Sequence, residues 1–379
     1  MREMRVALLR DFVEENWPSM EVYADRLAQG LRKTATELEI IEVKVPAWSW
    51  RNWHLPTPYG RKASLRALGI YLSRWIRYPL ALRGIQADVH HILDNSYGHL
   101  AFFLDSRRTV VTSHGGTSLT WRRWNPEGPS MWLFDLAFRG MLQATAIIVV
   151  SQYARQELLI ETNYPPERVH VVYHGVDERF RPSADNERWQ VRHRYLQSGE
   201  KALLLHVGHC AARKNVEGLL RAVALLQQRG VSVRFLQVGG IFTSAQHRLL
   251  EALGIKGAVT QISHVPNTEL PSLYGAADVF VFPSFYEGFG IPLIEAMACG
   301  TPIVCSDWEL FHEVCGDAAW FADPHRPEAI AEAIVRVLED PALASDLRER
   351  GLQRARAFTW EQNALRTLEV YHRVLENSA

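Results

Sequence analysis

The chain has 379 residues, of which 47% are hydrophobic and 22% charged, and its formal net charge is zero. This length exceeds what one ordinary core supports and predicts two domains, while the zero charge says nothing about partners. The cysteines Cys210, Cys299, Cys305 and Cys315 have neither C-x-x-C spacing nor a histidine cluster beside them, which excludes a zinc module. No apolar run approaches the roughly 18 residues of a membrane span. We therefore expect a cytoplasmic protein with structural thiols.

Short apolar segments alternate with helical patterns along the chain. The first segment begins close to the N-terminus and is too short for a signal peptide. Six strands are expected over residues 5–9, 39–45, 89–93, 108–114, 146–151 and 169–175. Six more are expected over residues 201–208, 233–240, 258–263, 279–284, 301–306 and 318–323. Such alternation is typical of parallel, doubly wound sheets, so the predicted fold class is α/β with two Rossmann-like domains.

The domain boundaries follow from the polar stretch between the two series. Residues 1–180 are expected to form the N-terminal domain, 181–200 a linker and 201–359 the C-terminal domain. A capping-box pattern at Thr359 begins a terminal helix over residues 360–379, which is expected to pack back on the N-terminal domain. Ligands of such sheets lie at the carboxyl ends of the strands, so we expect the site in a cleft between the facing domains.

A basic and aromatic segment covers residues 44–87, which contain no acidic side chain. On a helical projection from Arg61 to Tyr78, basic residues share one side and leucines most of the other. This pattern is typical of a helix on an anionic membrane surface, to which the aromatic cluster at residues 121–134 could add. Two alternatives are an ordinary helix with a solvated basic face and a site for an acidic soluble acceptor. No nucleic-acid-binding fold is recognisable, so no nucleic acid is expected as a partner.

Two cations, Arg213 and Lys214, stand directly before a helix that is expected to begin at Asn215 and end at Gly230. Cations are unfavourable at a helix N-terminus unless an anion shares the site. A diphosphate held by both side chains and the helix end resolves the conflict. The alternative is that both side chains are solvated. The G-x-G-x-x-G and P-loop patterns are absent, so the phosphate is not held by either of those motifs.

A second anion site is expected where a glycine turn precedes a helix that begins near Pro292 and ends at Gly300. Free backbone N–H groups at such a helix start bind anions. Glu287 and Glu295 flank the turn and would repel phosphate, but both fit as acceptors for hydroxyl groups. The segment therefore predicts a ligand that carries both phosphate and sugar hydroxyls. The alternative is a structural turn, with Glu295 complementing the helix dipole.

These motifs resemble glycosyltransferase family 4, the retaining GT-B enzymes. The E-x7-E element in "EGFGIPLIEAMACGTPIV" is the most specific motif, and "RKN", "VSQYARQEL" and "VYHGVDERFRP" also match family segments. The match is strong from about residue 110 onward and weak over residues 12–100, where this family binds acceptors. The resemblance implies retaining transfer of a hexose from a nucleotide diphosphate sugar to a glycan or lipid-linked acceptor. It implies neither a catalytic metal nor another cofactor. GDP-mannose is the first expectation for the donor and a UDP-hexose the second.

The resemblance also implies roles for residues of the C-terminal domain. Glu295 would bind the ribose hydroxyls and Glu287 would face the donor sugar. Arg213 and Lys214 would stabilise the departing diphosphate. Sugar hydroxyls and phosphate would be held by the backbone amides of Gly288, Phe289, Gly290 and Ile291.

For the N-terminal domain the resemblance places His114 beside the reacting carbon. Its alternative role is a buried, hydrogen-bonded core histidine, which is also our interpretation of His90, His91 and His99. The leaving phosphate is expected to accept the acceptor's proton, so no side chain is assigned as general base. The sequence departs from the family in the first strand–helix loop. Backbone amides of Ser19 and Met20 stand there in place of a glycine pair.

A further departure is His209, which stands where family members have an arginine. Three other functions remain open on the same residues: a nucleotide-sugar epimerase, a phosphorylase and a non-catalytic nucleotide-sugar-binding protein. An epimerase would work on the donor without an acceptor. A non-catalytic protein should retain the phosphate contacts but need not retain Glu287 and His114, and the sequence has both. If the protein contacts a membrane, we expect it to lie peripherally on the inner face of the cell membrane.

Overall fold

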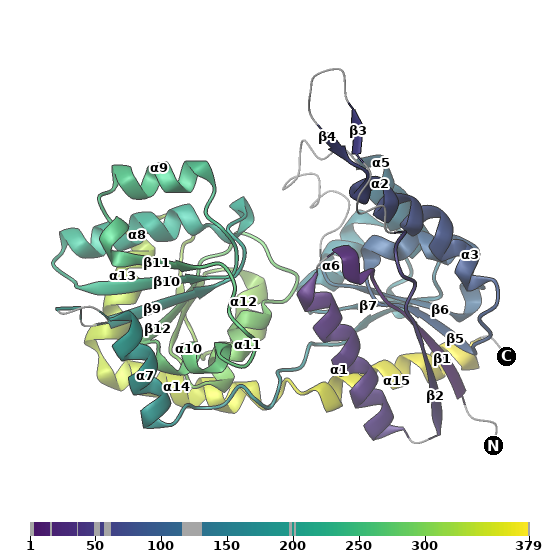
Figure 1. The fold of residues 1–379 in the computed structure, drawn as a ribbon. Helices are drawn as coiled ribbons and strands as arrows, with labels where there is room; N and C mark the ends of the chain where they lie inside the picture. Colours follow the sequence, from purple (N-terminus) through teal and green to yellow (C-terminus); the bar gives the residue numbers. More distant parts are fainter. Residues whose placement is uncertain are drawn as a thin grey trace. The chain divides into compact units, whose positions relative to one another are not determined.

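The computed structural model describes residues 4–15, 17–35, 37–48, 54–56, 62–115, 131–196, 199–200 and 202–377. The chain divides into two compact units (Figure 1). Unit 1 comprises Met1–His174 together with Trp360–Ala379, and unit 2 comprises Gly175–Thr359. Each unit is built on its own six-stranded parallel sheet, which confirms the predicted α/β fold class.

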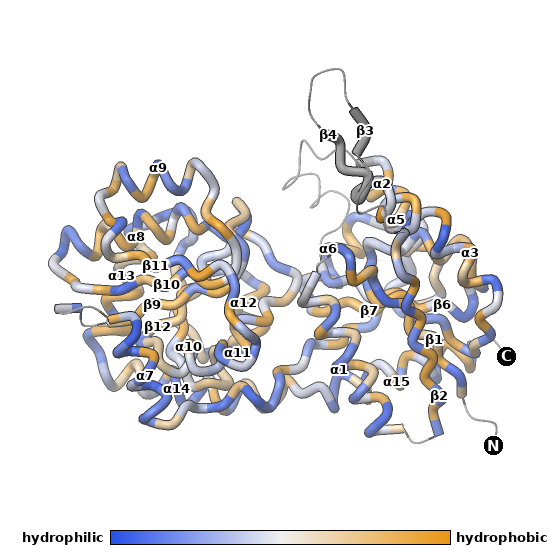
Figure 2. Tube along the Cα trace, viewed as in Figure 1, coloured by the Kyte–Doolittle hydropathy of each residue, from blue (hydrophilic) through white to orange (hydrophobic). Residues whose placement is uncertain are grey.

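The sheet of unit 1 has the strand order β2-β1-β5-β6-β7-β8. Its strands are β1 (Met4–Leu9), β2 (Leu38–Val43), β5 (Val89–Ile92), β6 (Thr109–Ser113), β7 (Ala146–Val149) and β8 (Val169–Val171). Residues of β5, β6 and β7 are buried without alternation, because helices cover both faces of the sheet. Figure 2 shows apolar residues concentrated in the central strands.

Two helices far apart in the sequence cover one face of this sheet. α1 (Pro18–Thr34) and α15 (Trp360–Glu376) contact each other closely, since a β-carbon on Gly30 would lie 2.8 Å from Ala364 Cβ. Their apolar residues form one core with Val6 and Leu8 of β1. The terminal helix thus belongs to unit 1.

The other face of the sheet is covered by shorter elements that share a second core. They are the 3-10 segment η3 (Asn95–Phe103), α3 (Tyr78–Leu82), α5 (Met131–Met141) and α6 (Gln152–Glu161). η3 and α5 approach each other so closely that a β-carbon on Gly98 would lie 2.4 Å from the carbonyl oxygen of Ala137. Glycine is required at this contact because any side chain would collide with backbone.

The basic segment differs from the regular helix that the sequence predicts. α2 (Leu65–Leu72) runs into a π-helical turn over Ser73–Arg77 before α3 begins. A π-helical turn adds a residue to the turn, so the simple projection fails beyond it. Arg74 is partly buried and ion-paired, whereas Ile76 is 45% exposed. Arg51, Arg61 and the tryptophans Trp50 and Trp53 lie outside the described residues, as do positions 121–130 of the second aromatic cluster.

A short antiparallel pair of strands precedes α2. β3 (His54–Pro56) pairs with β4 (Lys62–Ser64), and the sequence did not predict either. Within the described part of the chain, no helix is both long and apolar enough to cross a membrane.

The sheet of unit 2 has the strand order β11-β10-β9-β12-β13-β14. Its strands are β9 (Ala202–Val207), β10 (Val233–Val238), β11 (Val259–Ile262), β12 (Val279–Phe282), β13 (Ile303–Ser306) and β14 (Trp320–Ala322). All six fall within predicted segments. The two central strands, β9 and β12, are almost fully buried.

Pairs of helices pack around this sheet. α8 (Val216–Gln228) packs against α13 (Pro327–Glu339), and α11 (Ile291–Ala298) packs against α14 (Pro341–Ala355). The remaining helices of the unit are α7 (Asp185–Tyr195), α9 (Ser244–Ala252), α10 (Leu270–Ala276) and α12 (Glu309–Cys315). α7 lies inside the range 181–200 that was expected to be a linker, and it packs on α10 within unit 2.

Candidate functional site

The loop after β9 is fixed by one asparagine. Asn215 has φ 54°, a left-handed conformation that asparagine tolerates better than most residues. Its Oδ1 accepts the N–H of Gly218 at 3.2 Å and so caps α8, as predicted. Its Nδ2 donates to the carbonyl of Pro324 at 2.7 Å. The preceding 3-10 turn, Ala212–Lys214, is thereby held at the carboxyl end of β9.

Arg213, Lys214 and Glu287 meet in one charged cluster. Arg213 Nη1 donates to Glu287 Oε2 at 2.9 Å, and Lys214 Nζ lies 2.6 Å from Glu287 Oε1. Glu287 is 7% exposed and Lys214 6%. Burial alone would raise the pKa of Glu287, but the charges of Lys214 and Arg213 outweigh it and hold the pKa below its ordinary value. The sequence predicted a diphosphate beside the two cations. In the structure Glu287 supplies the negative charge there, and the diphosphate stays a prediction.

Backbone hydrogen bonds tie the two loops of this cluster together. The Phe285 N–H donates to the Arg213 carbonyl at 2.7 Å, and Arg213 Nη1 also donates to the Tyr286 carbonyl at 3.1 Å. The Lys214 ammonium lies 4.8 Å from the centre of the Phe282 ring, a distance suited to a cation–π contact. Burial lowers the pKa of Lys214, and the charge of Glu287 opposes this shift.

The glycine turn after Glu287 leads into α11 as predicted. Gly290 is the N-cap with φ 95°, and Gly300 follows the helix with φ 68°. Gly288 and Ile291 flank the turn, so all four predicted amide positions lie at the N-terminus of α11. The Phe289 side chain is 3% exposed and packs edge-on against Phe358, with ring centres 5.6 Å apart. That side chain anchors the turn in the core, which leaves only its backbone for a ligand.

Glu295 lies on α11 and is partly buried. Its Oε2 accepts the Tyr274 hydroxyl at 2.8 Å. Burial raises the pKa of Glu295 to about 7, although the Tyr274 hydroxyl and the charge of Arg179 act in the opposite direction. Arg179 itself pairs with Asp177 at 2.8 Å. A carboxylate with one oxygen bonded to tyrosine has acceptor capacity left for ligand hydroxyls.

His114 follows β6 in unit 1 and has protein partners on both ring nitrogens. Its Nε2 lies 2.7 Å from the Leu93 carbonyl, and its Nδ1 lies 3.3 Å from His174 Nε2. The ring stacks parallel to His174 and lies edge-on to Tyr23. Burial lowers its pKa. Both ring nitrogens therefore have partners, as in the alternative role, but the residue is only partly buried, and the catalytic role stays a prediction.

The other histidines of this sheet occupy core positions. His91 is fully buried between the Tyr371 hydroxyl at 2.6 Å and Thr112 Oγ1 at 2.7 Å. His99 is 1% exposed and stacks on Trp75, with ring centres 3.9 Å apart. His90 is also buried. Within the described ranges, no three His, Cys, Asp or Glu side chains are grouped so as to hold a metal ion.

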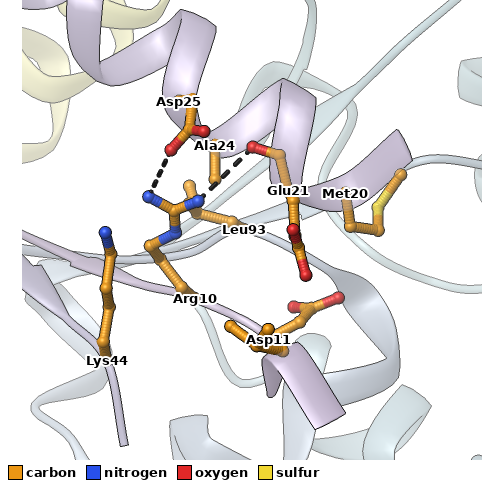
Figure 3. A pocket seen from close by; sticks show the side chains of 9 residues that line it. Arg10, Asp11, Met20, Glu21, Ala24, Asp25, Lys44 and Leu93 are labelled. Carbon is orange, nitrogen blue, oxygen red and sulfur yellow. Dashed lines mark hydrogen bonds and ion pairs between the residues drawn. The ribbon is translucent and has the colours of Figure 1, made fainter. Parts of the chain in front are cut away.

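Ser19 and Met20 lie in the first turn of α1. The Met20 N–H already donates to the Trp17 carbonyl at 3.0 Å, so it is engaged within the helix start rather than open to a ligand. The Met20 side chain instead lines a pocket of ≈ 200 Å³ (Figure 3). The pocket is lined by Arg10, Asp11, Val13, Met20, Glu21, Ala24, Asp25, Lys44 and Leu93.

Both cations of this pocket are paired with carboxylates. Arg10 is 8% exposed, and its Nη1 lies 2.6 Å from Asp25 Oδ1 and 2.7 Å from Glu42 Oε2. Lys44 pairs with the same Glu42 at 3.3 Å. Figure 3 shows the Asp11 and Glu21 carboxyl groups on the side of the pocket away from these cations.

An acidic cluster that begins with Asp11 was not predicted from the sequence. Asp11 follows β1, Asp94 follows the adjacent strand β5, and Glu15 lies nearby. Burial and the other two carboxylates raise the pKa of Asp11 well above its ordinary value. Arg74 Nη1 pairs with Glu15 at 3.2 Å, and its guanidinium lies over the Tyr97 ring. The position of both aspartates directly after neighbouring strands is the signal that could have predicted the cluster.

Comparison with known proteins covers most of the chain. A model described as "Glycosyltransferase Family 4" matches residues 20–180, and one described as "Glycosyl transferases group 1" matches residues 187–354. An O-antigen chain mannosyltransferase B of Escherichia coli is 33% identical over 276 residues, which are 71% of this chain and 72% of that protein. A D-inositol 3-phosphate glycosyltransferase 1 of Catenulispora acidiphila is 34% identical over 336 residues, which are 85% of this chain and 79% of that protein.

A solved structure extends the similarity to the whole fold. Sucrose-phosphate synthase from Thermosynechococcus elongatus superposes with a TM-score of 0.77 at 20% identity, covering 98% of this chain and 99% of that one. At this identity the match concerns the arrangement of helices and strands.

Proposed function

The chain belongs to glycosyltransferase family 4, the group 1 glycosyl transferases, and we propose that it is a retaining hexosyltransferase. In this proposal the donor is a nucleotide diphosphate sugar and the acceptor is a glycan or a lipid-linked glycan. The mannosyltransferase of Escherichia coli supports mannose as the hexose. GDP-mannose is the first candidate for the donor and a UDP-hexose the second.

The observation that carries the proposal is the cluster of Arg213, Lys214 and Glu287. Two cations converge on one buried carboxylate at the carboxyl end of β9, where Rossmann-like sheets bind ligands. A diphosphate carries more negative charge than one carboxylate and has more acceptor oxygens, so it can take over both cations. Charge that develops on the departing diphosphate is then neutralised by fixed side chains, which is why the proposal includes no metal.

When Arg213 and Lys214 bind the diphosphate, the Glu287 carboxylate can accept hydrogen bonds from hydroxyls of the donor sugar. Glu295 holds the ribose through the acceptor capacity that Tyr274 leaves open. The amides at Gly288–Ile291 stand at a helix N-terminus, where partial positive charge favours an anion. This division of tasks explains why acids flank a turn that otherwise suits phosphate.

The chemical step is a substitution on one face of the sugar. The bond from the anomeric carbon to the diphosphate oxygen breaks as the bond to the acceptor oxygen forms, and the acceptor's proton passes to the leaving phosphate. No side chain is needed as general base. His114 contributes to sugar binding in this proposal by exchanging its Leu93 carbonyl contact for a sugar hydroxyl.

The test is an assay of the purified chain with GDP-mannose and UDP-glucose, with and without oligosaccharide or lipid-linked acceptors. We expect acceptor-dependent release of the nucleoside diphosphate and an anomeric proton signal with the donor's configuration. Lys214→Ala should lose this activity, whereas Lys256→Ala, a substitution of an exposed residue of unit 2, should keep it.

Other outcomes would support the alternatives. Conversion of the donor sugar without an acceptor indicates an epimerase, and a requirement for inorganic phosphate indicates a phosphorylase. Binding without turnover of any donor indicates a nucleotide-sugar-binding protein. A product with the opposite anomeric configuration would contradict retention.

A further inference from the structure

His206 is a fully buried histidine near the carboxyl end of β9. Its Nδ1 lies 2.9 Å from the Val281 carbonyl, which accepts only from a protonated nitrogen. Nε2 is therefore the unprotonated nitrogen of the ring and acts as an acceptor. Among the residues that the structure describes, Nε2 has no hydrogen-bond donor. A buried acceptor without a partner is costly and calls for an explanation.

The explanation lies in the space beside Gly208. A β-carbon at residue 208 would lie 3.5 Å from His206 Nε2 and 3.5 Å from Lys214 Nζ. Both nitrogens therefore border the volume that a side chain would fill. A water in that volume would lie within reach of both nitrogens, and movement of the flexible lysine side chain into it would allow a direct bond.

The chemistry of the two groups is complementary. The Lys214 ammonium has three N–H donors, and its ion pair with Glu287 Oε1, 2.6 Å from Nζ, does not occupy all of them. His206 Nε2 offers a lone pair and no proton, so it cannot donate to a phosphate oxygen. A cationic donor is the partner that suits it, and Lys214 is the one that borders the same volume.

We infer that His206 is a positioning residue for Lys214. Its Nε2 accepts one N–H of the ammonium, directly or through one water beside Gly208, and leaves the third N–H directed at the donor diphosphate. The inference rests on the proposed function for the ligand, but the contact between the two side chains does not. It also explains why a phosphate-binding lysine keeps its orientation when the diphosphate draws it from Glu287.

The protonation state of His206 fits this role. Burial lowers its pKa to about 4, and the charge of Lys214 acts in the same direction, while Glu287 opposes it. Arg213 is the other charged residue of the cluster. The ring therefore stays a neutral acceptor at neutral pH.

The first experiment measures nucleotide affinity by calorimetry in a double-mutant cycle. GDP and UDP, and the matching monophosphates, are titrated into the wild type, His206→Phe and His206→Gln, each with and without Lys214→Ala. We expect His206→Phe to weaken diphosphate binding about tenfold, or about 1.4 kcal/mol, and to leave monophosphate binding unchanged. His206→Gln keeps an acceptor and should restore most of the affinity. With Lys214→Ala present, His206→Phe should have no further effect.

If His206→Phe weakens the binding of mono- and diphosphates equally, or weakens diphosphate binding as much when Lys214→Ala is present, the inference is wrong. His206 would then serve only the packing of β9. A second experiment needs no ligand: the ¹⁵N chemical shift of His206 Nε2 in wild type, Lys214→Ala and Lys256→Ala. We expect a shift only in Lys214→Ala, toward the value of a non-bonded nitrogen. An unchanged signal would overturn the contact, whereas failure of every nucleotide to bind would overturn the proposed function alone.

Discussion

Replacing Glu287 with glutamine tests the charged cluster without a large change of shape. The substitution removes the negative charge that Lys214 and Arg213 share at 2.6 and 2.9 Å. Breaking a buried ion pair by removing one partner costs about 3–5 kcal/mol. The Lys214 side chain is 7% exposed and that of Arg213 35%, so solvent screens the second pair and the lower end of this range applies.

A loss of about 3 kcal/mol lowers the melting temperature of a domain of 150–250 residues by roughly 6–12 °C. We expect this shift in the transition of unit 2, followed by calorimetry or hydrogen exchange of its amides. Since a diphosphate replaces the missing anion, saturating GDP or UDP should raise the melting temperature of Glu287→Gln more than that of wild type. Transfer activity should nevertheless fall, because the carboxylate that faces the sugar is gone.

The matched control is Glu217→Gln, which removes an exposed acid from the first turn of α8. It should leave the melting temperature, its increase with nucleotide and the transfer activity nearly unchanged. Two results would refute the reasoning. One is a Glu287→Gln protein with the same melting temperature as the wild type. The other is a nucleotide-induced stabilisation that is no larger in the variant than in the wild type.

Substitutions at three further residues test the nucleotide site, the acidic cluster and the cap of α8. Burial raises the pKa of Glu295 to about 7, so the carboxylate that accepts the ribose hydroxyls becomes protonated as the pH is lowered from about 8 to about 6. Nucleotide affinity measured by calorimetry should therefore fall severalfold over this range. The affinity of Glu295→Gln should not change with pH over the same range. The raised pKa also means that Glu295 stabilises the ligand-free fold at low pH and that this stability is lost as the pH rises through about 7. Arg74→Ala leaves Asp11 and Glu15 without their cation and should destabilise unit 1 by about 3 kcal/mol at neutral pH, the lower end of the cost of breaking a buried pair, because Arg74 and Glu15 are 19% and 12% exposed. The loss should be smaller near pH 4, where these acids with raised pKa are protonated. Equal urea-unfolding losses at both pH values, or a similar loss in the exposed Arg83→Ala, would contradict this. Asn215→Ala should lower the free energy of unfolding by about 1–2 kcal/mol through the lost cap of α8. Asn215→Gly should lower it less, since glycine adopts the left-handed conformation freely. Urea unfolding that ranks the two variants in the opposite order would contradict the role of Asn215 as the cap.

The strands of both sheets could be predicted from sequence because their signal is local. Segments such as residues 279–284 and 301–306 are apolar throughout, and β12 and β13 lie within them. β3 and β4 were missed because three-residue strands carry no periodicity. The π-helical turn at Ser73–Arg77 was also missed, since nothing in a regular helical projection marks the added residue.

The side-chain pairs of the candidate site could not be predicted from local sequence patterns. The helix dipole predicted a diphosphate beside Arg213 and Lys214, but it did not predict their pairing with Glu287, which lies 74 residues from Arg213 in the sequence. Only the packing of β9 beside β12 brings these loops together. In the same way Arg74 fits a basic surface in sequence, whereas the fold turns it toward Glu15, 59 residues away. Pairings of this kind depend on tertiary structure.

The measurement that tests the central claim most directly is calorimetric binding of GDP, UDP and ADP to the purified chain, with Glu295→Ala as control. The account predicts selective binding of one nucleotide, weakened in the variant by about 1–3 kcal/mol through the lost hydrogen bond to ribose. Absence of binding to all three, or a variant that binds as the wild type does, would contradict the assignment of this site to a nucleotide diphosphate sugar.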